Sequence, residues 1–197
     1  MTRPLFAVLA ALSLCACVAV KEPVGTSVGY ANDPALEGLW TGKPGKDKPP
    51  GYYHVILNDD ATMTVVGVAP RSGDDKASWG TLALTTAKLG PNRYMNLRET
   101  SEDGAPPKDM HAPDESIPLY YTVDGDTLTV FSLDEDKVKA AIRSGRVEGT
   151  ITVNKVGPAS YDSVAITADG PHLDALLAAR DAPALFEQAM TLKKVAP

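Results

Sequence analysis

Cysteine and histidine are scarce in this sequence of 197 residues. The two cysteines, Cys15 and Cys17, both lie close to the start, and three histidines (His54, His111 and His172) are far apart in the rest. A disulfide framework is therefore excluded for the remainder of the chain. No two histidines have a metal-ligand spacing such as H-x-x-x-H, so we expect no metal site and no cofactor.

The hydrophobic run near the start is short. It covers residues 5–14, about ten residues, which is too few to span a bilayer as a helix. It follows Met1-Thr2-Arg3-Pro4, a short basic segment. This length and these flanks are typical of a cleaved secretory signal peptide.

Motifs for catalysis are missing as well. Ser72 and Ser144 lack the G-x-S-x-G elbow, and there is no glycine-rich phosphate loop. The acidic groups 59–60 and 134–136 do not follow the spacing of a calcium loop. The sequence therefore offers no nucleophile, base or metal constellation. An enzyme is the least favoured class, although a site assembled from distant residues would leave no such pattern.

Charge and composition restrict the partners. The chain has 19 basic and 25 acidic residues, a net charge of −6, and these charges are scattered. Such a chain is a poor match for nucleic acid. Hydrophobic residues make up 44%, which excludes wholesale disorder.

One short motif near the start is informative. Leu14-Cys15-Ala16-Cys17 resembles the bacterial lipobox, in which the last cysteine receives a lipid. The resemblance implies cleavage after residue 16 and a diacylglycerol on Cys17, whose several acyl chains would anchor the protein permanently. Val18 follows, where aspartate would signal inner-membrane retention, so we expect an outer-membrane protein facing the periplasm. An ordinary cleaved signal peptide or an N-terminal core helix are the alternatives.

The composition divides the chain into three parts. Residues 1–16 are the expected leader, and their removal takes away one arginine and no acid, which changes the net charge from −6 to −7. Residues 17–35 contain small residues, glycine and proline without periodicity, and we expect a lipidated tether there. Residues 36–197 are long enough for a single β-rich domain with its own core.

Alternating and β-branched runs predict many short strands. Two hairpins are clearest, one around Asn58-Asp59-Asp60 and one around Asp124-Gly125-Asp126. The apolar pattern of the strands on either side of the first turn suggests burial on both faces. Residues 100–116 have an acidic, proline-containing pattern that predicts a surface excursion. The predicted strands cover residues 36–42, 52–57, 62–68, 78–85, 93–98, 119–123, 127–133, 147–153, 163–167 and 190–195.

Helices are predicted in two places. Residues 132–145 change to a helical period, with Ser132-Leu133-Asp134-Glu135 as a capping box and Gly145 as the stop. The tail has two further helical segments, which begin after Asp169 and after Asp181.

Together these elements predict a mainly β protein with added helices. We expect an antiparallel, lipocalin-like barrel or strongly curved sheet, with one inserted helix and a helical C-terminal segment. The alternative is an open α+β sheet with its helices packed across one face.

Gly38-Leu39-Trp40 resembles the first lipocalin motif, G-x-W on the opening strand. The resemblance implies that Trp40 closes one end of a barrel and that a basic residue of the last strand, Lys193 or Lys194, is its partner. A T-D-Y triplet of the same family is not evident. The order of lipobox, tether and barrel is also similar to that of small, uncharacterised lipoproteins of Gram-negative bacteria.

A barrel of this kind suggests a ligand cavity lined by aromatic residues from the strands, which could equally be core. We expect a small-ligand or lipid-binding module, with a membrane contact through the N-terminal lipid. The alternative is a non-enzymatic structural or interaction lipoprotein that contacts another envelope protein through an edge strand or the acidic segment 100–116. The candidate cavity residues are Trp40, Tyr53, Trp79, Tyr94, Tyr121 and Phe131.

Overall fold

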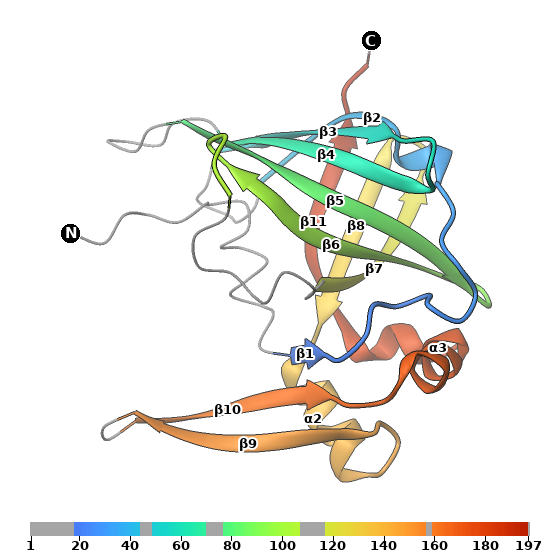
Figure 1. Cartoon of the computed structure of the whole chain (residues 1–197), viewed down its shortest axis with the longest axis vertical. Helices are drawn as coiled ribbons and strands as arrows, with labels where there is room; N and C mark the ends of the chain where they lie inside the picture. Colours follow the sequence, from blue (N-terminus) through green and yellow to red (C-terminus); the bar gives the residue numbers. More distant parts are fainter. Residues whose placement is uncertain (1–17, 44–48, 70–76, 107–116, 157–158, 197) are drawn as a thin grey trace.

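The structure is a computed structural model that describes residues 18–43, 49–69, 77–106, 117–156 and 159–196 (Figure 1). The leader and Cys17 lie outside the described residues, so the expected lipidation stays a prediction. Within the described part, the chain forms a closed barrel with a smaller sheet and two helices beside it.

The barrel has eight antiparallel strands in an up-and-down order. The last strand, β11, closes it by pairing with the first, β2, through Lys193 opposite Thr41 and Lys194 opposite Trp40. This confirms the predicted barrel and excludes the open sheet. The strands are β2 (Gly38–Gly42), β3 (Gly51–Leu57), β4 (Thr62–Ala69), β5 (Ser78–Leu89), β6 (Asn92–Glu102), β7 (Ile117–Asp124), β8 (Thr127–Leu133) and β11 (Phe186–Lys194).

Side chains alternate along these strands between the barrel interior and its outer surface. On β3, Tyr53 and Val55 are buried inside while Tyr52 and Ile56 are exposed outside. Burial of β3 and β4 on both faces, as predicted, is therefore wrong, because nothing in the described part covers this outer surface. Both predicted hairpin turns are confirmed, with β3 joined to β4 and β7 joined to β8.

A smaller unit is inserted between β8 and β11. It consists of α2 (Glu135–Arg143), the β9–β10 hairpin (Gly149–Val156 and Ala159–Ile166), α3 (Gly170–Ala178) and the 3-10 turn η2 (Ala182–Leu185). The hairpin gains a third strand from the N-terminal side, β1 (Val18–Val20), which runs parallel to β10. In Figure 1 this unit lies below the barrel.

A second hydrophobic core joins the inserted unit to the outer surface of the barrel. Tyr94 of β6 and Phe186 of β11 contribute from the barrel, with ring centroids 5.8 Å apart. Val138, Val164 and Leu173 contribute from α2, β10 and α3. One side of the barrel is thus covered, while none of the described residues covers the outer surface of β3 and β4.

Two helix predictions need correction. The N-cap of α2 is Asp134, whose carboxylate accepts a bond from the Lys137 amide at 3.1 Å, and not Ser132. Ser132 still belongs to β8, because strand pairing with β11 continues through Leu133. The segment after Asp181 forms only η2, and β11 begins at Phe186, because pairing with β8 overrides the local helical pattern.

The loop prediction is also partly wrong. Residues 100–102 continue β6, where Ser101 and Glu102 pair with β5, and residues 107–116 lie outside the described residues. The helix after Asp169 is confirmed as α3, and Asp169 caps it by accepting a bond from the His172 amide at 3.0 Å. Gly145 follows α2 with a φ of +73°, as a helix stop requires.

The segment expected to be a tether is folded against the barrel instead. Val24 is fully buried, and its backbone forms two hydrogen bonds with the Asn96 side chain. The Val24 amide donates to Asn96 Oδ1 at 2.9 Å, and the Val24 carbonyl accepts from Asn96 Nδ2 at 2.8 Å. The short helix η1 (Pro34–Leu36) then places Leu36 at one end of the barrel. The segment is folded because it contacts residues far away in the sequence. Its own sequence does not reveal these contacts, and this explains why a tether was expected.

Candidate functional site: the barrel cavity

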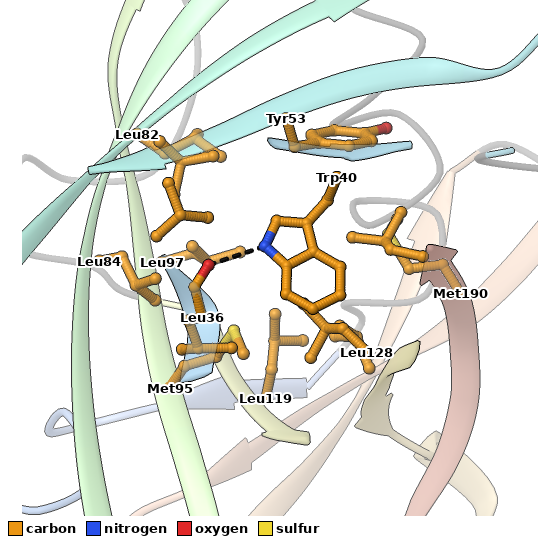
Figure 2. Close-up of a pocket in the computed structure, with 14 residues that line it drawn as sticks. Leu36, Trp40, Tyr53, Leu82, Leu84, Met95, Leu97, Leu119, Leu128 and Met190 are labelled. Atoms are coloured by element: carbon orange, nitrogen blue, oxygen red, sulfur yellow. Dashed lines mark hydrogen bonds between the residues drawn. The ribbon is translucent and has the colours of Figure 1, made fainter. Parts of the chain in front are cut away.

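The barrel encloses a cavity of about 60 Å³. Figure 2 shows that its lining side chains converge from around the barrel, and that Leu36 of η1 joins them. None of the lining residues carries a charge. They are Leu36, Trp40, Tyr53, Val55, Val65, Leu82, Leu84, Met95, Leu97, Leu119, Leu128, Val130, Met190 and Leu192.

Trp40 is the largest side chain in this lining. It is fully buried, and its indole N–H donates a hydrogen bond to the Leu36 carbonyl at 2.7 Å (Figure 2). Because that bond satisfies the single polar atom of the indole, the remainder of the ring presents only carbon to its surroundings.

Asp33 fixes η1 at this end of the barrel. Its carboxylate caps η1 through the Ala35 amide at 3.0 Å and accepts a bond from the Tyr121 hydroxyl at 2.8 Å. Arg93 lies 3.4 Å from the same carboxylate. Burial, together with the bond to Asp33, raises the pKa of Tyr121. The N-terminal segment thus closes this end through side chains of β6 and β7.

A cation also lies over the Trp40 ring. The Lys194 ammonium of β11 lies 5.3 Å from the ring centroid, within the range of a cation–π contact. Gly38 has a φ of +114°, and a Cβ there would lie 3.1 Å from Cε of Lys194. Of the two lysines proposed from the G-x-W resemblance, Lys194 is therefore the one that meets the tryptophan.

Among the lining residues, Tyr53 is the one with an ionisable group. Its hydroxyl is buried and has no hydrogen-bond partner among the described residues. Burial raises its pKa to about 12. Gly51 leaves room for this hydroxyl, since a Cβ at that position would lie 2.9 Å from it. Ser132, on the inner face of β8, has a second buried hydroxyl without a described partner.

The predicted aromatic residues are divided between three environments. Trp40 and Tyr53 line the cavity, and Tyr121 belongs to the same core without lining it. Trp79 is on the outer surface and 44% exposed, while Tyr94 and Phe131 pack in the second core beneath the inserted unit. A two-residue alternation predicts strands without showing which face points inward, and this accounts for the mixed result.

Sequence reasoning missed all of the aliphatic lining. Leu82 with Leu84 and Met95 with Leu97 are pairs two residues apart, and this spacing was the available signal. Met190 begins the predicted strand 190–195, but only aromatic residues were proposed for the lining.

Tyr53 is the only titratable side chain among the described residues that line the cavity. In the part of the chain that the structure describes, no three His, Cys, Asp or Glu residues are grouped so that they would hold a metal ion. Among the described helices, none has the length and apolar character needed to cross a bilayer. Comparison of the chain with protein-family models, with curated proteins and with solved structures finds no match.

Proposed function

We propose that this protein is an envelope lipoprotein whose barrel binds a narrow apolar group, such as the end of one acyl chain. The observation that carries the proposal is the uncharged cavity inside a closed barrel. Small barrels of this strand number hold either packed side chains or one small ligand.

The volume limits the ligand class. Pockets for drug-sized molecules measure about 300–1,000 Å³, and an apolar cavity of about 150 Å³ accepts benzene. A cavity of about 60 Å³ is smaller than both, so a ligand must be thin or must displace side chains. Met95 and Met190 in the lining are unbranched and flexible, and their adjustment would lengthen the space along the barrel.

The lining also determines which part of a ligand enters. Each buried methylene contributes about 0.8 kcal/mol to binding, whereas an unpaired ionised group in such a lining is strongly unfavourable. A carboxylate or phosphate headgroup would therefore stay outside the barrel. The Tyr53 hydroxyl is buried and contributes no surface to the cavity, so the lining offers a ligand only apolar contacts.

The cellular location follows from the lipobox resemblance. Acylation of Cys17 would hold the barrel at a membrane surface, in the compartment where acyl chains are available. Mass spectrometry of the N-terminal peptide tests this part alone: the expected product begins at Cys17 and carries the mass of its acyl chains. An unmodified N-terminus would refute the anchor without bearing on the cavity.

Solvent extraction of the protein purified from membranes tests the ligand. The expected result is an apolar compound that remains bound after repeated washing, in an amount near one per barrel. A matched preparation of the Val65→Phe variant, whose new side chain occupies the cavity, should release none. An empty extract from the wild-type protein would count against a resident ligand.

The outer surface favours a second candidate, contact with another envelope protein. Tyr52, Val68 and Trp79 lie side by side on β3, β4 and β5 and are all exposed. Neighbouring apolar residues of this kind mark interaction surfaces. Crosslinking in intact membranes would test this, because a Trp79→Ser variant should lose a specific crosslinked partner that an Ile56→Ser variant keeps.

A further inference from the structure

The β9–β10 hairpin extends beyond the rest of the inserted unit. Figure 1 shows the last part of β9 and the first part of β10 to the left of both α2 and β1. Asp162 of β10 forms an ion pair with Lys139 of α2 at 2.8 Å, and Lys139 also forms an ion pair with Glu135. We define the hairpin end as Val153, which lies opposite Asp162, together with Lys155, Ser160 and Tyr161, which lie nearer the turn; all four are exposed.

The hairpin end is apolar for a surface element. Val153 is 62% exposed and Tyr161 is 56% exposed, on opposite faces of the hairpin. Among residues 153–161, Lys155 is the single charged residue, although the chain as a whole is acidic. Valine, tyrosine and lysine together suit the boundary between lipid headgroups and acyl chains, where a lysine stem lies in apolar surroundings and its ammonium meets phosphate.

Strand pairing places this end next to the anchor position. Val18 is buried and pairs with Val164 of β10, and the two strands run parallel. The start of β1, at Val18, therefore points towards the end of the sheet where β9 and β10 are joined. Cys17 is the next residue, and its Cα lies within about 3.8 Å of that of Val18. No flexible tether separates an acylated Cys17 from the folded protein.

The same strand register shows how far the hairpin end extends past the anchor position. Tyr161 lies three residues beyond Val164 towards the turn, which is about 10 Å along the strand. The hairpin end thus extends several ångströms further than Cys17 can reach. Interfacial elements insert about 5–10 Å into the boundary between headgroups and acyl chains, which matches this reach.

We propose that the hairpin end inserts into the membrane surface beside the N-terminal lipid and fixes the orientation of the barrel on the bilayer. This rests on the acylation of Cys17 proposed above and is independent of ligand binding in the barrel. The partner that the hairpin end contacts is the lipid surface. Because no tether separates an acylated Cys17 from the fold, the anchor brings that surface to the hairpin.

Site-directed spin labelling of the acylated protein tests this. Cys15 leaves with the leader and the acylated Cys17 has no free thiol, so Val153→Cys and Tyr161→Cys each introduce a unique labelling site. Val28→Cys is a matched control, because Val28 is also apolar and is 58% exposed. It follows Ser27, whose amide bonds to Asp174 of α3, and Figure 1 shows α3 on the right of the inserted unit, whereas the paired ends of β9 and β10 lie on the left.

In vesicles of phosphatidylethanolamine and phosphatidylglycerol, labels at 153 and 161 should be more accessible to oxygen than to a water-soluble nickel complex. The label at 28 should show the reverse. Water-like accessibility at both hairpin positions would overturn the proposal, and so would an unmodified Cys17. Ser160→Cys replaces either variant if it fails to fold. Ligand extraction, measured separately, distinguishes failure of the barrel proposal from failure of this one.

Discussion

The ammonium of Lys194 lies over the ring of Trp40, 5.3 Å from its centroid. This contact joins the first and last strands of the barrel, at the place where their pairing closes it. The Trp40 indole is bonded to Leu36 in turn, so one tryptophan links the closing strand to the short helix at the barrel end.

Replacing Lys194 by methionine tests the contribution of this charge, because methionine keeps the apolar stem. We expect a loss of about 1 kcal/mol in the free energy of unfolding, measured by urea titration. Lys193→Met is the control, since Lys193 pairs with Asp126 where both side chains are exposed, and its loss of stability should be clearly smaller than that of Lys194→Met. Equal losses in the two variants would contradict a specific role for the contact.

Two tyrosines inside the barrel should respond in opposite ways to loss of the hydroxyl. Tyr53→Phe removes a buried hydroxyl without a described partner, so we expect a gain of about 1 kcal/mol in stability. Tyr121→Phe removes a bond to the Asp33 carboxylate and should cost about 2 kcal/mol. A loss of stability in Tyr53→Phe would show that its hydroxyl is hydrogen-bonded in solution.

Buried tyrosines also predict a loss of stability in alkali. The pKa of Tyr53 is raised to about 12 from its ordinary value of 10.0, and those of Tyr94 and Tyr121 are raised as well, chiefly by burial. Above pH 10 the unfolded chain releases protons that the folded chain retains, so stability is complete below pH 10 and falls as the pH rises towards 12. Denaturant titrations across this range should show a shallower fall in Tyr53→Phe than in the wild type.

The N-terminal segment depends on one buried carboxylate. Asp174 of α3 accepts bonds from the amides of Gly25 and Ser27, at 2.7 Å and 2.9 Å, and from the Ser27 hydroxyl at 2.6 Å. Asp174→Ala should cost about 3 kcal/mol because it leaves these donors unpaired. Hydrogen exchange should speed up at residues 25 and 27.

Asp169→Ala is the control for that variant. It removes an exposed helix cap on the same helix and should cost clearly less stability than Asp174→Ala does. Unchanged exchange at residues 25 and 27 in Asp174→Ala would show that the segment is held by other contacts.

The barrel itself could be predicted because its strands are local patterns. Alternation and turn residues such as Gly125 act over a few neighbours, so both hairpins are visible in the sequence. Which face of a strand points inward is decided by the whole barrel. Trp79 was therefore predicted to line the cavity and lies outside, while Leu119 was overlooked and lies inside.

The remaining differences come from contacts between distant parts of the chain. β1 is only three residues long and becomes a strand because Val18 meets Val164. Phe186 begins a strand within a helical pattern because it pairs with Leu133 of β8. Such pairings depend on residues far away in sequence, and no local pattern records them.

The most direct test of the account compares Val65 with its neighbour Val66 in the binding of a fluorescent fatty acid. Val65 lines the cavity and Val66 faces outward on the same strand. Val65→Phe fills the cavity and should weaken binding at least about tenfold, a loss of about 1.4 kcal/mol, whereas Val66→Phe should bind as the wild type does. Equal binding by both variants, with both folded, would contradict binding inside the barrel.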